Sequence, residues 1–373
     1  MKYYIVAGEA SGDLHASNLI KAIREKDPEA DFRGWGGDLM EEQGCELVKH
    51  YRDLAFMGFW EVFKNLNTVL RNINICKVDI LLYEPDVVIL IDYPGFNLRI
   101  AQFAKENSIR VVYYIAPQVW AWKKGRVKKI MAFVDDLLVI LPFEEAFYAQ
   151  YNYPVHFVGN PLLDAMAQFD RQSDKVRNFR QYQSLNEKPI IAILPGSRKQ
   201  EITAMLPIML QVIDDFPDYQ FVISTVNWQP YSLYSNILKN RDIKLVEGDT
   251  YPLLLNATAA VVASGTASLE TALLNTPQVV CYKGSWISYF IAKQLVKGIN
   301  YISLANLILD KQIFSELIQG EVNRKRIVKE LRAILGDKET IDSMKQDYET
   351  LRDKLGNGGA SEKAAEVICQ KKS

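Results

Sequence analysis

The chain has 373 residues, of which 49% are hydrophobic and 24% are charged, and its formal net charge is −1. This balance is typical of a globular protein and excludes a disordered chain, and the low net charge excludes a general electrostatic attraction for nucleic acid. A chain of this length is too long for one ordinary core, so we expect two domains.

Metal sites, disulfides and membrane spans are not indicated. The four cysteines lie far apart without a Cys-x-x-Cys pair, and the chain has only three histidines. We therefore expect reduced thiols and no metal site. No signal-peptide pattern opens the chain, and no apolar run reaches the roughly 18–20 residues that span a bilayer. These features predict a cytoplasmic protein that is at most bound to a membrane surface.

The chain opens with a strand, a glycine turn and a helix. Tyr3 to Ala7 read as a buried strand, and 14–23 reads as an amphipathic helix. The turn between them has the spacing Gly-x-x-x-Gly rather than the dinucleotide fingerprint Gly-x-Gly-x-x-Gly. We expect its residues to approach a sugar or a diphosphate, and those residues are Gly8, Glu9, Ser11 and Gly12.

The remainder of the first half alternates apolar runs with helical patterns. Continuous apolar runs of this length are typical of parallel strands covered on both faces. The predicted strands are 86–92, 110–116, 136–143 and 155–159, and the predicted helices include 97–107 and 143–151.

A polar, charged stretch interrupts this pattern, and the alternation then restarts. The predicted strands of the second half are 188–198, 219–225, 243–248, 259–266 and 277–283. Two doubly wound α/β units explain this order most simply. The expected division is an N-terminal domain at 1–170, a linker region at 171–187, a second domain at 188–345 and a helical tail at 346–373. Two paths remain open for the tail, which can pack back on the first domain or against a partner subunit.

Two loops of the second domain suit an anionic ligand, because ligands of open parallel sheets bind at the carboxyl ends of the strands. In LPGSR, residues 194–198, Ser197 and Arg198 stand between a strand and a helix, where backbone N–H groups and a guanidinium fit a diphosphate. A capped turn with a solvated arginine is the structural alternative. In SGTASLE, residues 264–270, Glu270 can accept hydrogen bonds from a ribose diol or simply complement the helix dipole.

The ordered motifs resemble a known family. Strand–PGSR–helix followed by strand–ASGT-x-x-x-E–helix is similar to the donor half of GT-B glycosyltransferases, in which two doubly wound domains face a central cleft. The full set resembles the lipid-A-disaccharide synthases, glycosyltransferase family 19, over nearly the whole chain. The motifs are GEASGD (8–13), IDYPGFN (91–97), PQVWAW (117–122), LPFE (141–144), LPGSR (194–198), SGTASLE (264–270) and YISLANL (301–307).

The resemblance implies an inverting transferase. Such an enzyme joins UDP-2,3-diacylglucosamine to 2,3-diacylglucosamine 1-phosphate and forms a β-1,6 disaccharide and UDP in lipid A biosynthesis, with neither metal nor cofactor. Asp92 is implied as the catalytic carboxylate, which either deprotonates the acceptor 6-hydroxyl or only orients it, although an aspartate two residues before a proline also serves as a structural turn residue. The implied UDP-binding residues are Ser197, Arg198, Gly265, Thr266, Glu270 and Asn306.

Two positions depart from the family pattern. Many members read Asp-Ala-Pro-Asp-Phe-Asn where this chain has Gly95 in place of the second acid, which weighs against a mechanism that needs a carboxylate pair. Ala305 stands where proline is usual before Asn306.

Two segments suit acyl chains or a lipid surface. Residues 56–63 hold four aromatic side chains and a methionine, and two tryptophans precede five cations among residues 123–129. A core helix edge and a solvated helix face are the structural alternatives. The predicted contact residues are Phe56, Met57, Phe59, Trp60, Trp120, Trp122, Lys123, Lys124 and Arg126. We expect peripheral association with the cytoplasmic face of the inner membrane and leave a homodimer open.

Two other functions remain as alternatives. One keeps the fold and changes the chemistry, to a UDP-sugar 2-epimerase or a GT-B transferase with a soluble acceptor. The other is a non-enzymatic two-domain binding protein. The aromatic segment 56–63 argues against the first, and the two phosphate-type loops argue against the second.

Overall fold

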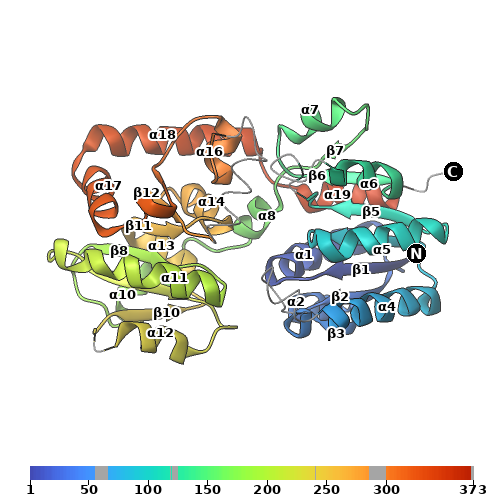
Figure 1. The fold of residues 1–373 in the computed structure, drawn as a ribbon, viewed down its shortest axis with the longest axis horizontal. Coiled ribbons are helices and arrows are strands. Elements are labelled where there is room, and N and C mark those ends of the chain that lie inside the picture. Colours follow the sequence, from blue (N-terminus) through green and yellow to red (C-terminus); the bar gives the residue numbers. More distant parts are fainter. Residues whose placement is uncertain (55–65, 118, 120–124, 240, 285–299, 371–373) are drawn as a thin grey trace. The chain divides into compact units, whose positions relative to one another are not determined.

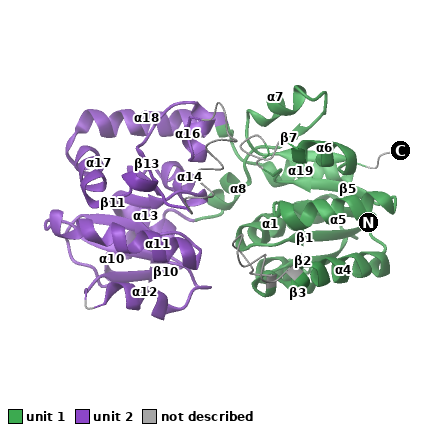
Figure 2. Cartoon of the chain, in the orientation of Figure 1, with its two compact units in different colours: residues 1–169, 355–373 green, residues 170–354 purple. Residues whose placement is uncertain are grey.

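The computed structural model describes residues 1–54, 66–117, 119, 125–239, 241–284 and 300–370. The chain forms two compact units, shown separately coloured in Figure 2. Unit 1 comprises Met1–Phe169 and Leu355–Ser373, and unit 2 comprises Asp170–Lys354. Each unit is an α/β domain built on one parallel sheet (Figure 1).

Unit 1 contains a sheet with the strand order β3-β2-β1-β4-β5-β6-β7, and each neighbouring pair is parallel. The strands are β1 (Lys2–Ala7), β2 (Asp31–Gly36), β3 (Glu46–His50), β4 (Val87–Ile91), β5 (Arg110–Tyr114), β6 (Asp136–Val139) and β7 (His156–Phe157). The helices between them are α1 (Ala10–Lys26), α2 (Asp38–Glu42), α4 (Leu66–Tyr83), α5 (Pro94–Glu106), α6 (Gly125–Phe133) and α7 (Glu144–Ala149), and α8 (Pro161–Ala167) follows β7.

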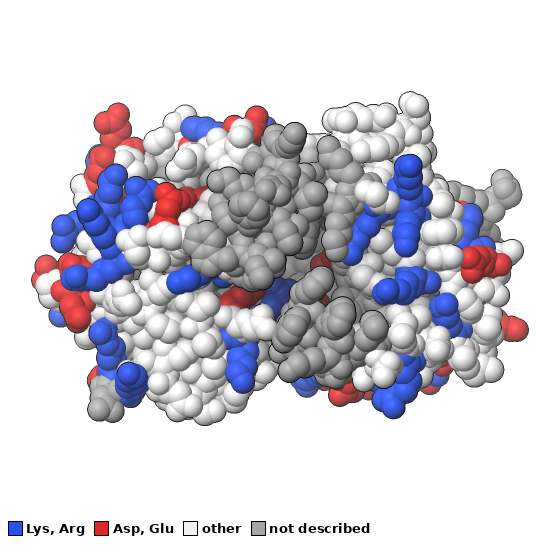
Figure 3. Space-filling model, viewed as in Figure 1, with Lys and Arg blue, Asp and Glu red and all other residues white. Residues whose placement is uncertain are grey.

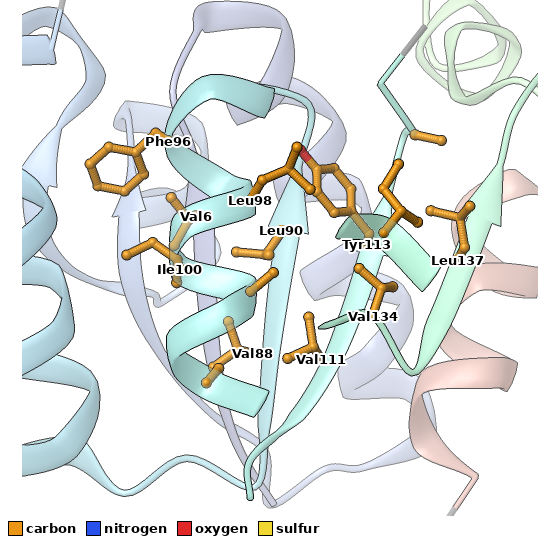
Figure 4. Packing of buried hydrophobic residues seen from close by; sticks show 14 of the residues in the cluster. Val6, Val88, Leu90, Phe96, Leu98, Ile100, Val111, Tyr113, Val134 and Leu137 are labelled. Carbon is orange, nitrogen blue, oxygen red and sulfur yellow. The ribbon is translucent and has the colours of Figure 1, made fainter. Parts of the chain in front are cut away.

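Apolar clusters cover both faces of this sheet, because successive side chains of a strand point to opposite sides. In β1, Tyr4 and Val6 join one cluster with α4, α5 and α6, whereas Tyr3 and Ile5 join another with α1. Figure 4 shows strand residues of the first cluster against the apolar face of α5. Burial on both faces explains why these strands read as continuous apolar runs.

Unit 2 contains a sheet with the order β10-β9-β8-β11-β12-β13, again parallel throughout. The strands are β8 (Ile190–Leu194), β9 (Gln220–Thr225), β10 (Lys244–Glu247), β11 (Ala257–Ala263), β12 (Gln278–Tyr282) and β13 (Glu316–Ile318). The helices are α9 (Asp174–Arg177), α10 (Phe179–Tyr182), α11 (Lys199–Met209), α12 (Tyr231–Leu238), α13 (Thr250–Asn256), α14 (Thr266–Leu273), α16 (Leu304–Leu309), α17 (Arg324–Gly336) and α18 (Lys338–Leu355).

The last helix, α19 (Ala360–Cys369), belongs to unit 1. The carboxylate of Asp164 in α8 accepts hydrogen bonds from the N–H groups of Gly359 at 2.7 Å and Ser361 at 2.8 Å. At the other end of the helix, the Arg110 guanidinium donates to the carbonyls of Val367 and Ile368, at 2.9 and 2.7 Å. Both ends of α19 are therefore fixed by charged side chains of unit 1.

The ten predicted strands are confirmed, and three further strands, β2, β3 and β13, escaped prediction. β2 has the sequence DFRGWG, whose glycines break the strand pattern. A side chain at Gly34 would collide with the carbonyl oxygen of Ile5 in the paired strand, so glycine is needed for this close approach. β3 has no continuous apolar run, and β13 has only three residues.

Candidate functional site

The turn after β1 holds the first group of predicted site residues. Glu9 is the residue before α1, so Ser11 and Gly12 lie in the first turn of the helix. Ser11 is exposed and Glu9 is half-buried. A Cβ at Gly8 would lie 2.5 Å from the Tyr93 ring, and one at Gly12 would lie 3.3 Å from the Ala7 side chain. Packing within unit 1 therefore accounts for both glycines.

The acid of the same motif, Asp13, has a structural role. It is only 2% exposed, and its carboxylate accepts hydrogen bonds from the N–H groups of Gly37, Leu39 and Met40 at 2.8–3.2 Å. Burial raises the pKa of Asp13, and these three backbone donors oppose the rise. The carboxylate thus holds the start of α2 against the start of α1.

The turn after β4 carries Asp92. Asp92 is half-buried, and both Asp92 and Tyr93 adopt left-handed backbone conformations, with φ of 44° and 46°. The carbonyl oxygen of Asp92 accepts hydrogen bonds from the Tyr113 hydroxyl at 2.6 Å and the Asn97 side-chain amide at 2.8 Å. The acid that the sequence singled out therefore stands on an unusual, firmly bonded turn at the carboxyl end of a central strand.

Arg126 also influences the Tyr113 hydroxyl, which binds the Asp92 carbonyl. It is half-buried near the start of α6, which follows β5. Burial raises the pKa of the Tyr113 hydroxyl far above its usual value, the charge of Asp92 adds to the rise, and the charge of Arg126 opposes it. Asp92 and Arg126 are thus both close enough to affect one hydroxyl group.

In unit 2, the loop after β8 presents Ser197 and Arg198. The side chain of Arg198 is 48% exposed and forms an ion pair with Glu201 at 3.0 Å. The other oxygen of Glu201 accepts hydrogen bonds from the N–H groups of Ser197 and Arg198, at 3.2 and 3.3 Å. Glu201 therefore engages the same N–H groups and guanidinium that are predicted to bind a diphosphate. Glu201 was not predicted as a site residue, although a glutamate at the third helical position is a capping signal.

Trp228 is a second neighbour that the sequence analysis missed. It lies in the loop after β9, and its indole N–H donates a hydrogen bond to the carbonyl of Ser197 at 3.0 Å. The side chain is 44% exposed. No local pattern predicts this contact, because it depends on β9 lying beside β8 in the sheet.

The loop after β11 and the start of α14 hold three more of the predicted UDP-binding residues. Gly265 and Thr266 are exposed at the start of α14, and Glu270 is half-buried one turn later. The Tyr251 hydroxyl donates a hydrogen bond to the Glu270 carboxylate at 2.7 Å. Burial raises the pKa of Glu270, and this hydrogen bond opposes the rise.

The strand order brings these loops of unit 2 to one edge. β8 and β11 are parallel neighbours, so residues 194–198 and 264–270 follow adjacent carboxyl ends. Tyr282 ends the next strand, β12, and the charge of Glu201 adds to the rise that burial causes in the pKa of Tyr282. Three neighbouring strand ends thus contribute to one polar edge.

Asn306 is fully buried in α16. Its side-chain amide donates to the carbonyl of Phe314 at 3.2 Å and to Glu316 at 2.9 Å, and its oxygen accepts from the N–H of Ile313 at 2.9 Å. Glu316 also accepts hydrogen bonds from the N–H groups of Ile302 and Ser303. The structure therefore uses Asn306 to hold the turn before α16 against the segment that leads to β13.

Most of the residues predicted to contact acyl chains or a membrane lie outside the described ranges: Phe56, Met57, Phe59, Trp60, Trp120, Trp122, Lys123 and Lys124. Across the ranges that the structure does describe, no helix is long and apolar enough to cross a bilayer. Within the same ranges, no cluster of three His, Cys, Asp or Glu side chains could hold a metal ion.

The profile of the LpxB family, described as lipid-A-disaccharide synthetase, matches residues 3–371. The chain belongs to the lipid-A-disaccharide synthase family. The lipid-A-disaccharide synthase of Syntrophus aciditrophicus (strain SB) is 42% identical over 368 residues, which cover 97% of this chain and 95% of that protein. That of Trichlorobacter lovleyi is 37% identical over 98% of this chain and 96% of its own length. This lipid-A-disaccharide synthase family member is a glycosyltransferase of lipid A biosynthesis.

Solved structures show that the family member has the GT-B fold. The UDP-GlcNAc 2-epimerase of Neisseria meningitidis, bound to UDP-GlcNAc, superimposes with a TM-score of 0.70 over 99% of each chain, at 13% identity. The glycotransferase of kitacinnamycin superimposes with a TM-score of 0.62 over 98% of each chain, also at 13% identity. Identity this low supports the fold alone, so the 2-epimerase alternative is not favoured over the family match.

Proposed function

We propose that this chain transfers the sugar of UDP-2,3-diacylglucosamine to 2,3-diacylglucosamine 1-phosphate, forming a β-1,6 disaccharide and UDP. The family match over residues 3–371 is the observation that carries the proposal. The paired loops of unit 2 support it, because they place a guanidinium and a carboxylate at one sheet edge, where a nucleotide of this type binds in doubly wound folds.

Unit 2 is the proposed donor domain. Arg198, with Ser197, would bind the diphosphate, which offers the guanidinium more negative charge than Glu201 does. Gly265 and Thr266, exposed at the start of α14, would approach the phosphates through their N–H groups. Glu270 would accept hydrogen bonds from the ribose hydroxyls, and Tyr251 already orients its carboxylate.

Asn306 has an indirect part in this proposal. The buried hydrogen bonds of its side-chain amide fix the turn that precedes α16, so Asn306 would shape the nucleotide site through the backbone. Ala305, in the place where the family usually has proline, is fully buried beside it. The hydrogen bonds of Asn306 restrain the backbone of this segment, where a proline ring would otherwise restrain it.

Unit 1 is the proposed acceptor domain, and Asp92 is its proposed general base. Asp92 would take the proton from the 6-hydroxyl as the hydroxyl oxygen attacks the anomeric carbon. The bond from that carbon to the phosphate oxygen then breaks, and UDP leaves with the bonding electrons. Arg198 and nearby N–H groups would stabilise the charge on the departing UDP. The turn after β1, with Glu9 and Ser11, would offer further polar contacts to the substrates.

A lipid surface is the proposed location of the reaction, on the cytoplasmic face of the inner membrane. Helix α4 supports this proposal, because it carries exposed apolar side chains, with Val78 57% and Leu82 79% exposed. Three others on the same helix are Leu70, Ile75 and Leu81. Exposed Lys128 and Lys129 of α6 would add attraction to anionic lipid. Figure 3 shows where Lys and Arg side chains lie on one face of unit 1.

Vesicle binding tests the membrane proposal. The double change Val78→Ser and Leu82→Ser should weaken binding to phosphatidylglycerol vesicles by about tenfold, because each side chain loses favourable apolar burial. The change Tyr182→Ser, at a side chain of unit 2 that is 61% exposed, is the control and should have no effect. Equal binding by all three proteins would contradict a role for α4. A homodimer stays an open alternative, which sedimentation equilibrium can test.

Product analysis tests the proposed reaction. Purified enzyme with UDP-2,3-diacylglucosamine and 2,3-diacylglucosamine 1-phosphate should release UDP and disaccharide in equal amounts. Enzyme that leaves both acylated substrates unchanged but epimerises UDP-GlcNAc, a donor without O-linked acyl chains, would contradict the proposal. The same assay with a short-chain donor separates recognition of the sugar from recognition of the acyl chains.

A further inference from the structure

We infer that Tyr113 and Asn97 are positioning residues for the reaction, which hold the Asp92 turn so that its carboxylate meets the acceptor hydroxyl. The inference rests on the proposed catalytic role of Asp92 and adds two buried residues that do not touch the substrate. It concerns unit 1 alone.

The backbone at Asp92 and Tyr93 would not adopt this shape unaided. Two successive residues with side chains have positive φ, at 44° and 46°. Left-handed conformations are unfavourable for residues other than glycine, and a residue that precedes proline is restricted further. Tyr93 precedes Pro94, which starts α5. The surrounding structure must therefore hold the turn in place.

Two buried side chains provide this restraint. The Tyr113 hydroxyl and the Asn97 amide both donate to the carbonyl oxygen of Asp92, at 2.6 and 2.8 Å. The Asn97 amide also donates to the carbonyl of Ile91 at 3.1 Å, so it joins the last residue of β4 to the turn. The N–H of Asn97 in turn donates to the carbonyl of Tyr93 at 3.0 Å.

The burial of these polar groups argues for a specific role. Tyr113 and Asn97 are both 0% exposed, and the Tyr113 ring lies among the apolar side chains of β4, β5 and α5 (Figure 4). Burying a hydroxyl or amide is costly unless it is hydrogen-bonded, and phenylalanine would fill the ring position without that cost. The oxygen of the Asn97 amide has no hydrogen-bond partner among the described residues. The core thus tolerates two polar groups that both donate to the Asp92 carbonyl, and the Asn97 amide also reaches the carbonyls of Ile91 and of Val6 in β1.

The Tyr113 hydroxyl remains a donor over the working pH range. Burial, together with the charge of Asp92, raises its pKa far above the usual value, so the hydroxyl keeps its proton. The restraint that Tyr113 places on the Asp92 turn is therefore expected to be independent of pH.

The test compares Tyr113→Phe with a matched control, Tyr148→Phe. Tyr148 belongs to the same apolar cluster and is also 0% exposed, but its hydroxyl has no hydrogen-bond partner among the described residues. Tyr113→Phe should lower kcat about tenfold, because small displacements of a general base reduce the rate strongly. The dissociation constant of UDP should stay within about twofold, because UDP is assigned to unit 2. Tyr148→Phe should leave both quantities unchanged.

A double variant separates this inference from the catalytic role of Asp92. If Tyr113 acts through Asp92, adding Tyr113→Phe to Asp92→Asn should cause no further loss of kcat. Full activity of Asp92→Asn would refute the proposed base instead. The inference itself would be refuted if Tyr113→Phe left kcat unchanged. It would also be refuted if Tyr113→Phe lowered kcat by the same factor in the wild-type enzyme and in Asp92→Asn. Asn97→Ser removes the other donor to the Asp92 carbonyl, so it should also lower kcat. This loss should disappear when Asp92 is replaced by asparagine.

Discussion

The side chains that we propose for catalysis in unit 1 and for UDP binding in unit 2 are held in different ways. In unit 1, the backbone of Asp92 is fixed from behind by fully buried side chains, Tyr113 and Asn97. In unit 2, the partly exposed Arg198 and the half-buried Glu270 are instead paired at their functional ends, with Glu201 and Tyr251 respectively.

This difference matches two kinds of task. A general base must be aimed before the reaction begins, and a backbone that is fixed by buried bonds achieves this. A ligand-binding cation must exchange partners when the ligand arrives. An exposed ion pair such as Arg198 with Glu201 contributes only about 0–1 kcal/mol to stability, so a diphosphate can replace it at low cost.

The largest expected effect comes from removing the charge of Asp92. Asp92→Asn should lower kcat by about 10²–10⁴, the usual contribution of a general base, with UDP affinity nearly unchanged. Steady-state kinetics and calorimetric titration with UDP measure the two quantities. The control is Asp86→Asn, the same substitution before the amino end of the same strand, where Asp86 binds the N–H of Lys2. An equal loss of UDP binding in Asp92→Asn would move Asp92 into the donor site and remove the contrast between the units.

The next effect concerns Arg198. Arg198→Ala should weaken UDP binding by roughly 10- to 100-fold, because a charge-assisted hydrogen bond to phosphate contributes about 1.5–3 kcal/mol. Arg324→Ala is the matched control, since it removes an exposed guanidinium of unit 2 that pairs with Asp215. Calorimetry should find control affinity close to wild type. Unchanged UDP affinity in Arg198→Ala would contradict the diphosphate assignment.

The smallest effect sharpens the contrast. Glu201→Gln should strengthen UDP binding by about threefold to tenfold. The glutamine side chain still offers an oxygen acceptor to the loop, but it lacks the negative charge, whose repulsion of a bound phosphate costs about 1 kcal/mol. Titration at low and high salt would reveal the electrostatic origin, since the gain should shrink as salt is added. Weaker binding would show instead that the Glu201 charge is needed to hold Arg198 in its binding position.

The fold followed from the sequence where the physical signal was local. Strands such as β4 and β8 are buried on both faces, so their residues form continuous apolar runs that can be read without a structure. β2 was not predicted because Gly34 interrupts its apolar pattern, and the reason for this glycine is the close approach of the neighbouring strand β1. Two of the predicted site residues, Asp92 and Arg198, stand in the loops that follow β4 and β8.

The partners of those residues could not be predicted in the same way. Tyr113 reads as one more buried strand residue, and only its place beside β4 brings its hydroxyl to Asp92. Trp228 meets Ser197 only because β9 lies beside β8. Gly8 illustrates the converse, since its lack of a side chain is explained by the Tyr93 ring, far away in sequence.

A crystal structure of the enzyme with UDP tests the central claim most directly. We predict diphosphate oxygens within about 3.2 Å of the Arg198 guanidinium, which has then left Glu201, and ribose hydroxyls on the Glu270 carboxylate. The Asp92 turn should keep its two left-handed residues, with the Asp92 carbonyl still bonded to Tyr113 and Asn97. UDP bound to the turn after β1 or β4, with Arg198 still paired to Glu201, would contradict this account.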